Sequence, residues 1–265
     1  MQAILGLLPC ICENKTMRYM LLITSLILYI NTAHALQVLI DPGHGGSDHG
    51  ARTDHLREAD ITLKIAKHLM RYMDKDNELS YSVTRKIDKS LELGDRSDLA
   101  HKSGADLFVS IHANASLNPR ARGPEIYIQN ILPSDQYSFF LANRENNGEA
   151  SERGTRPSKL SKEEYSADVV GIVDDLYRNH YIEKSYELAK VFEKRWKEDL
   201  GYRRVRMRQA PFFVVSAVNM PSVLLEVGYL TNSYEAKKLK TAWYQRKVAK
   251  SIYQAIKDYK SSLEN

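Results

Sequence analysis

Residues 38–46 read Val-Leu-Ile-Asp-Pro-Gly-His-Gly-Gly. A short apolar run that stops at an Asp-Pro pair is typical of a buried strand, and the glycines after it predict a loop. Such a strand would present the imidazole of His44 at its tip, as in a metal site or a catalytic loop. A strand-to-loop turn with an incidental histidine explains the stretch equally well. The interpretation therefore depends on what else converges there.

Two more apolar runs carry a polar residue near their ends. Residues 106–114 include His112, and residues 221–228 include Glu226. A carboxylate inside such a run is costly unless it is paired or functional. Glu58 lies one turn before the apolar stripe of a predicted helix that begins near Arg57, so its carboxylate could also point inward. A solvated first-turn glutamate is the alternative for Glu58.

The order of these patterns predicts an α/β fold. Short apolar runs alternate with helical periodicity, which favours a single α/β domain with an insertion. Because parallel strands end at one edge of a sheet, His44 and His112 are expected to share a site there. The other expected elements are strands at 81–85, 123–128 and 212–215, and helices at 91–103, 165–177, 189–196 and 234–263. The arginines of 203–208 are expected on a solvated face or loop, with contact to an anionic substrate as the alternative.

The charge is dispersed along the chain. The 265 residues carry a net charge of +5, with a pI near 9.0, and no long block of one sign. Nucleic-acid binding would require a concentrated basic stripe, so we expect no nucleic-acid partner.

The first 35 residues resemble a secretory signal peptide. Lys15 and Arg18 precede an apolar run at 19–30, and Ala33-His34-Ala35 provides the small residues of a cleavage site. The run is about 12 residues long, whereas a membrane span needs about 20. Translation could instead start at Met17. We expect an exported protein that is periplasmic or associated with the cell wall, whose mature chain has no membrane span and no cysteine.

The residues expected at the shared edge favour zinc chemistry. Two imidazoles and a carboxylate are the ligand set of a catalytic zinc that keeps a fourth position open for water. The mature chain offers no cysteine nucleophile, no Gly-x-Ser-x-Gly elbow and no His-Glu-x-x-His helix. A zinc hydrolase is therefore preferred over serine or cysteine chemistry.

Four motifs in order resemble the zinc-dependent N-acetylmuramoyl-L-alanine amidases of cell-wall peptidoglycan. They are Asp41-Pro42-Gly43-His44-Gly45-Gly46, then Glu58, then Ser110-Ile111-His112-Ala113-Asn114, then Pro221-Ser222-Val223-Leu224-Leu225-Glu226-Val227-Gly228 with Thr231-Asn232. The resemblance spans residues 37–260 and implies a mixed, mostly parallel twisted sheet flanked by helices, in a catalytic domain over 36–265. We expect this domain to act as a monomer.

What the resemblance implies for chemistry is specific. One Zn²⁺ per chain would be held by His44, Glu58 and His112, and Glu226 would be the general base. The bond cut would be the amide between the lactyl group of N-acetylmuramic acid and the L-alanine that begins the stem peptide. Such activity would serve cell-wall remodelling and daughter-cell separation.

The segment from about 129 to 181 is polar and lacks strand signals, which suggests an inserted lid or a mobile segment. In the septum-splitting branch of the family, an inserted helix places a glutamate on the zinc until an activator protein withdraws it. By position, Glu145 is the first candidate for such an inhibitory ligand and Glu149 the second.

Two other functions remain open from the sequence. An exported zinc peptidase that cuts bonds within the stem peptide would use the same ligands. A catalytically inactive wall-binding module would lack a ligand or the base, whereas all four residues are present.

Overall fold

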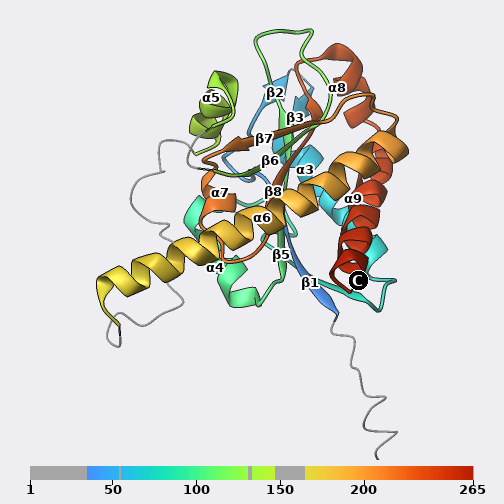
Figure 1. Ribbon diagram of the computed structural model, residues 1–265. Helices are drawn as coiled ribbons and strands as arrows, with labels where there is room; N and C mark the ends of the chain where they lie inside the picture. The colour runs from blue at the N-terminus through green and yellow to red at the C-terminus, as the bar shows by residue number, and fades with distance from the viewer. Residues whose placement is uncertain (1–34, 54, 131–132, 147–164, 265) are drawn as a thin grey trace, which may run out of the picture. The chain divides into compact units, whose positions relative to one another are not determined.

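The chain folds around a six-stranded sheet with the order β4-β1-β5-β8-β6-β7 (Figure 1). The computed structural model describes residues 35–53, 55–130, 133–146 and 165–264. Neighbouring strands are parallel except β6 and β8, which are antiparallel. The strands are β1 (Leu36–Pro42), β4 (Leu79–Val83), β5 (Leu107–Asn114), β6 (Glu125–Gln129), β7 (Arg206–Ala210) and β8 (Ser222–Tyr229).

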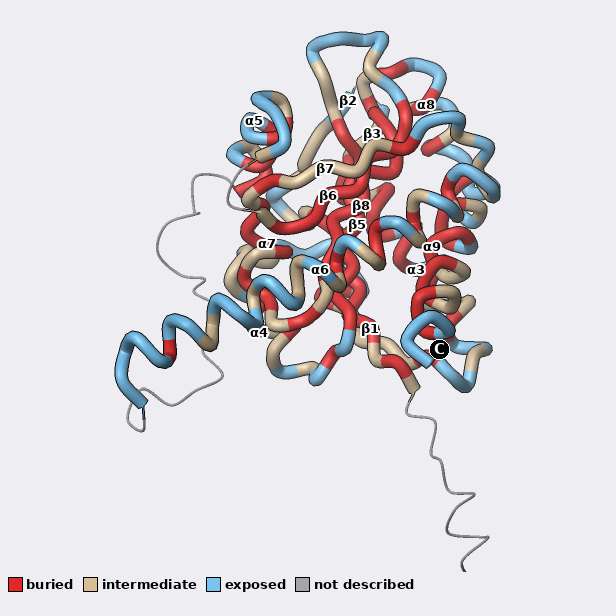
Figure 2. The backbone as a smooth tube through the Cα atoms, viewed as in Figure 1, coloured by how far each residue is buried: buried red, intermediate tan, exposed pale blue. Residues whose placement is uncertain are grey.

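Strand β1 shows why the sheet has two apolar faces. Its alternate residues Val38 and Ile40 join one hydrophobic cluster, while Leu39 joins another. Successive side chains of a strand point to opposite faces, so an unbroken apolar run marks a strand covered on both sides. Figure 2 shows this buried layer running through the sheet between helices whose outer surfaces are exposed.

Helices cover both faces of the sheet. The larger cluster packs under α3 (Glu58–Met73), α6 (Ala167–Leu200) and α9 (Ala242–Leu263). The smaller cluster includes apolar residues of α4 (Leu93–Ser103), α5 (Gln136–Glu145) and α7 (Phe213–Ser216). The remaining elements are the short antiparallel strands β2 (Arg52–Thr53) and β3 (Leu56–Arg57) and the helix α8 (Ser233–Leu239). The predicted fold class, a mostly parallel α/β sheet flanked by helices, is confirmed.

The strand predicted at 212–215 is wrong. Its apolar residues form the short helix α7, and the strand lies just before it, in β7. An apolar run of four residues does not distinguish a buried strand from a buried helical turn. Pro211 follows β7 directly, and its missing N–H cannot extend a sheet ladder. The arginines of 203–208 are therefore divided, with Arg206 and Arg208 in an edge strand instead of a loop.

Two helix predictions also need correction. The helices expected at 165–177 and 189–196 are one helix, α6, which runs on to Gly201 in the left-handed conformation. No glycine or proline breaks residues 178–188, so nothing local ends the helix there. The helix expected at 234–263 is two helices, α8 and α9. The second begins anew because Thr241 caps α9 by accepting a hydrogen bond from the Tyr244 amide.

Several predictions fall outside the described residues. These are the signal peptide up to His34, the alternative start at Met17 and Glu149. Within the described part of the chain, no helix combines the length and apolar character needed to cross a membrane.

Candidate metal centre

His44 is presented by the loop that leaves β1. It adopts φ 58°, a left-handed backbone conformation that a histidine rarely takes. Gly43 precedes it, and a Cβ there would lie 2.5 Å from the His112 ring. Only glycine therefore permits β1 and β5 to end with both imidazoles side by side, their ring centroids 4.9 Å apart.

Glu58 is held at the first position of α3. One of its carboxylate oxygens accepts a hydrogen bond from the Ala113 amide at 2.8 Å, and the other accepts one from the Ala51 amide at 2.8 Å. The side chain is buried, with 1% of its surface exposed. These amide donors fix the carboxylate next to both histidines, 3.0 Å from His112 Nδ1 and 3.2 Å from His44 Nε2. The inward-pointing alternative for Glu58 is the correct one.

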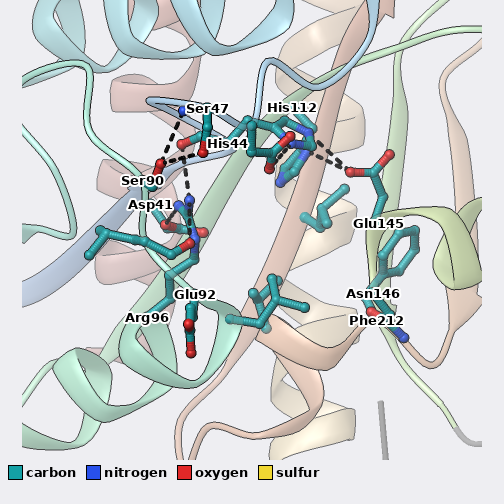
Figure 3. Close-up of a pocket in the computed structure, with 15 residues that line it drawn as sticks. Asp41, His44, Ser47, Ser90, Glu92, Arg96, His112, Glu145, Asn146 and Phe212 are labelled. Atoms are coloured by element: carbon teal, nitrogen blue, oxygen red, sulfur yellow. Dashed lines mark hydrogen bonds and ion pairs between the residues drawn. The ribbon is translucent and has the colours of Figure 1, made fainter. Parts of the chain in front are cut away.

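A fourth side chain, that of Glu145 at the end of α5, completes a cluster. Its Oε2 atom lies 3.1 Å from His44 Nε2 and 3.5 Å from His112 Nδ1 (Figure 3). Its Oε1 atom accepts hydrogen bonds from the Arg144 guanidinium at 2.8 and 3.1 Å. One ligand atom from each of His44, Glu58, His112 and Glu145 lies within 4.8 Å of the others.

These four residues fit a cation. The buried atoms His44 Nε2 and Glu145 Oε2 face each other, yet neither forms a hydrogen bond with any described residue. Two imidazole nitrogens and two carboxylates converging at this spacing are a donor set suited to a divalent metal. The cluster could therefore hold a metal ion.

The electrostatics of the cluster agree with that fit. Burial opposes the charged form of His44, but the Glu58 carboxylate and the bond to Asp48 outweigh it and raise the pKa of His44 well above its usual value. Burial likewise opposes ionisation of Glu58, but His44 and His112 hold its pKa well below the usual value. The site thus stabilises positive charge between its two carboxylates.

Asp48 contacts the site and was not among the residues predicted from the sequence. Its Oδ2 atom accepts a hydrogen bond from His44 Nδ1 at 2.7 Å, which leaves Nε2 to face the cluster. Carboxylates that bond the outer nitrogen of a ligating histidine fix its tautomer and orientation. A carboxylate four residues after His44, across a glycine turn, was the available signal.

A buried ion pair lies beneath the loop. Arg96 donates to Asp41 Oδ1 at 2.6 Å and to the carbonyl oxygens of Pro42 and His44. Asp41 also accepts hydrogen bonds from the hydroxyls of Thr84 and Ser110. Arg85 donates to the carbonyls of Pro42, Gly43 and Ala59. These bonds give Arg85 a structural role beneath the loop.

Glu226 lies beside the cluster but outside it. It is the Cα partner of His112 across β5 and β8, and 1% of its surface is exposed. Neither of its carboxylate oxygens has a hydrogen-bond partner in the part of the chain that the structure describes. Burial, followed by the charges of Glu58 and Glu145, raises the pKa of Glu226 well above its usual value. A buried, unpaired carboxylate of raised pKa is suited to accept a proton.

A cavity of about 270 Å³ opens from the cluster (Figure 3). The hydroxyls of Ser47 and Ser90 line one part of it, and Phe212 and Val214 line another. Glu145 also lines this cavity, so α5 forms part of its wall.

The fold and the cluster together define an α/β enzyme domain with a candidate metal site at the edge of its sheet. The family described as N-acetylmuramoyl-L-alanine amidase matches residues 38–258, and the chain belongs to this family. The resemblance and the enzyme class predicted from the sequence are confirmed.

Individual relatives agree with this assignment. The chain is 31% identical over 236 residues to a probable N-acetylmuramoyl-L-alanine amidase AmiB of Haemophilus influenzae, matching 88% of this chain and 54% of that protein. It thus spans about half the length of that relative. An N-acetylmuramoyl-L-alanine amidase from Clostridium difficile 630 has a similar structure, with a TM-score of 0.63, 29% identity, and coverage of 86% of this chain and 98% of that one. The CwlD amidase of Clostridioides difficile, solved in complex with the GerS lipoprotein, matches with a TM-score of 0.62, 25% identity, and coverage of 85% and 98%.

Proposed function

We propose that this protein cleaves peptidoglycan at the amide between the lactyl group of N-acetylmuramic acid and the L-alanine of the stem peptide. The observation that carries the proposal is the buried cluster of His44, Glu58 and His112 with Glu226 beside it on the next strand. Membership of the amidase family supports the choice of bond.

The residues of the site have distinct roles in this proposal. His44, Glu58 and His112 would hold one Zn²⁺, and Asp48 would keep Nε2 of His44 directed at it. Bound zinc would supply a water molecule of lowered pKa and polarise the scissile carbonyl. The Glu226 carboxylate would take the proton from the attacking water and pass it to the leaving amine of L-alanine.

Glu145 is proposed to inhibit the enzyme. A catalytic zinc with three protein ligands keeps its fourth position for water, and a carboxylate placed there would exclude that water. The contacts of Glu145 Oε2 with both histidines support this role. We propose that a partner protein withdraws α5, and the complex of CwlD with GerS supports this because it joins another amidase of the family to a protein partner.

We also propose the setting of the reaction from the sequence. Residues 1–35 would direct export and be removed, and residues 36–265 would act as a monomer in the periplasm or at the cell wall, during wall remodelling and daughter-cell separation. The segment 129–181 would be the regulatory insertion, which includes α5 and the beginning of α6.

Product analysis tests the proposal. Purified peptidoglycan is digested with the protein, and the products are identified by mass spectrometry. Glycan chains with free lactyl groups, together with intact peptides that begin with L-alanine, are expected. Peptides cut internally would instead identify a stem-peptide peptidase. If the wild type and variants with Glu145 substituted all leave peptidoglycan uncut, the protein is a binding module.

A further inference from the structure

A second cavity, of about 490 Å³, lies on the side of Glu226 away from the metal cluster. We call it the arginine pocket. Its lining includes four arginines and two tyrosines, namely Arg120, Arg122, Arg206, Arg208, Tyr137 and Tyr229. Neither the sequence motifs nor the metal centre accounts for it.

The register of the sheet places this pocket next to the proposed reaction site. His112, Glu226, Glu125 and Arg206 are successive Cα partners across β5, β8, β6 and β7. Strands in a sheet lie about 4.8 Å apart, so Glu125 is roughly 10 Å from His112 and Arg206 is one strand further. An extended chain covers about 3.3 Å per residue, so a substrate with its scissile bond at Glu226 reaches the pocket within two or three residues.

The pocket carries a surplus of positive charge. The buried carboxylate of Glu125 accepts a hydrogen bond from the Tyr127 hydroxyl at 2.7 Å and lies 3.5 Å from the nearest guanidinium nitrogens of Arg206 and Arg208. Arg208 is also paired with Asp135. Its Nε atom, which lies 3.5 Å from the Glu125 carboxylate, is buried and forms no hydrogen bond with any described residue.

Two of the arginines are free to bind a ligand. Arg120 and Arg122 are exposed in the loop before β6, and neither guanidinium forms an ion pair within the described ranges. Guanidinium groups held together repel one another, and the four arginines face three carboxylates, those of Glu125, Asp135 and Glu235, of which Glu235 interacts with Arg122. The pocket is therefore suited to an anionic group with several acceptor oxygens.

We infer that the arginine pocket binds a carboxylate of the stem peptide and so selects the peptide side of the scissile amide. This inference rests on the proposed function. The lactyl carboxyl of the sugar is consumed in the amide, so the glycan at this bond is uncharged, whereas a peptide on the other side carries free carboxylates. A guanidinium cluster within two or three residues of Glu226 therefore orients the substrate with its peptide over β6 and β7.

The test uses the full chain and compares two stem peptides. One begins with L-alanine and keeps its carboxylates, and the other has them converted to amides. Their affinities are measured by calorimetry for the wild type, for Arg120→Gln with Arg122→Gln, and for the matched control Arg71→Gln with Arg246→Gln. The control arginines line a separate cavity with His68 and Tyr72.

A specific pattern is expected. The double substitution in the arginine pocket weakens binding of the carboxylate peptide roughly tenfold, which corresponds to about 1.4 kcal/mol. The control keeps wild-type affinity, and the amide peptide binds all three proteins equally weakly. Equal affinities of the two peptides for the wild type, or equal losses in both double variants, would overturn the inference. Thermal melting confirms that each variant is folded.

A phosphate-rich polymer shares this charge chemistry, so polyglycerol phosphate is included as a competitor. If it displaces the carboxylate peptide at lower concentrations than free peptide does, the pocket is assigned to phosphate and the inference fails. Hydrolysis of muramyl peptides is measured separately. If the wild type binds the carboxylate peptide but does not hydrolyse muramyl peptides, the proposed function is refuted and the inference about the pocket still stands.

Discussion

His112 and Glu226 are Cα partners across β5 and β8. His112 belongs to the cluster of four candidate metal ligands, and Glu226 does not. Side chains paired on neighbouring parallel strands point to the same face of the sheet. His112 contacts Glu58 and Glu145, whereas both carboxylate oxygens of Glu226 lack a hydrogen-bond partner in the described part of the chain. The two strands thus set the proposed metal ligand His112 and the proposed proton acceptor Glu226 side by side.

Substituting these partners should separate metal binding from turnover. Glu226→Gln should keep bound zinc and lose about 10²–10⁴-fold in rate, because the amide cannot accept the proton. His112→Ala should lose zinc and activity together. Zinc content by atomic absorption and hydrolysis of purified peptidoglycan check both. Glu187→Gln on the exposed face of α6 serves as a control and should behave as the wild type.

Glu145→Gln should raise activity. Removing the charge weakens the attraction of α5 to the two histidines, and a loss of about 1.4 kcal/mol in closure raises the open fraction roughly tenfold. The rate of peptidoglycan hydrolysis is compared at equal zinc content. Unchanged or lower activity would argue against autoinhibition.

Asn146→Ala should have a smaller effect of the same sign. The Asn146 side chain donates to the Pro211 carbonyl and accepts from the Phe213 amide, each at 2.9 Å, so it fastens the end of α5 to the body of the domain. Each bond contributes about 0.5–1.5 kcal/mol. Asn143→Ala is the matched control, because Asn143 is exposed on the same helix. If both variants activate equally, the fastening role is wrong.

Arg96→Met should destabilise the fold strongly at neutral pH. Removing one partner of a buried ion pair costs about 3–5 kcal/mol. Arg195→Met is the comparison, because the Arg195 pair with Asp258 is partly exposed and should contribute only about 0.2–1 kcal/mol. Urea unfolding followed by circular dichroism measures both. Equal losses would show that burial does not distinguish the two pairs.

The same pair predicts a pH dependence. Burial raises the pKa of Asp41, but Arg96 and three hydrogen bonds outweigh it and lower the pKa below its usual 3.8. A lowered folded-state pKa means that the ionised carboxylate stabilises the fold above pH 3.8 and that this contribution is lost as pH falls through the lowered value. The difference in unfolding free energy between wild type and Arg96→Met should therefore be largest at neutral pH and shrink as the pH falls, because Asp41 is protonated at a higher pH in the variant, where Arg96 no longer opposes the effect of burial.

Gly43→Ala should impair metal binding more than folding. The added Cβ would overlap the His112 ring, so one ligand must move. We expect zinc affinity to fall about 10–100-fold, as for other changes that displace a ligand's support. Gly171→Ala, in α6 with no atom within 4 Å of the new Cβ, should stabilise the protein by about 0.5–1 kcal/mol. Wild-type zinc affinity in Gly43→Ala would refute this account of the loop.

Sequence patterns predicted the structure best where a feature depends on a single strand or helix. The unbroken apolar runs of β1, β5 and β8 predict buried strands, because a strand covered on both faces needs apolar residues at every position. The position of His44 and His112 at strand ends follows from the same pattern. The strand predicted for the short apolar run at 212–215 was wrong because periodicity cannot separate a strand from a buried helical turn.

The sequence by itself determined the fold class, the family and the candidate ligands His44, Glu58 and His112, because motif residues and apolar periodicity are local properties of the chain. Tertiary structure alone decided that Asp48 orients His44 and that Asp41 and Arg96 support the loop. It also brought Glu145, which the sequence offered only as a candidate by position, to the cluster. It also placed the arginine pocket one to three strands from the ligands. These contacts join segments distant in sequence, or depend on the left-handed turn at His44, so only the packed sheet and its loops set their distances.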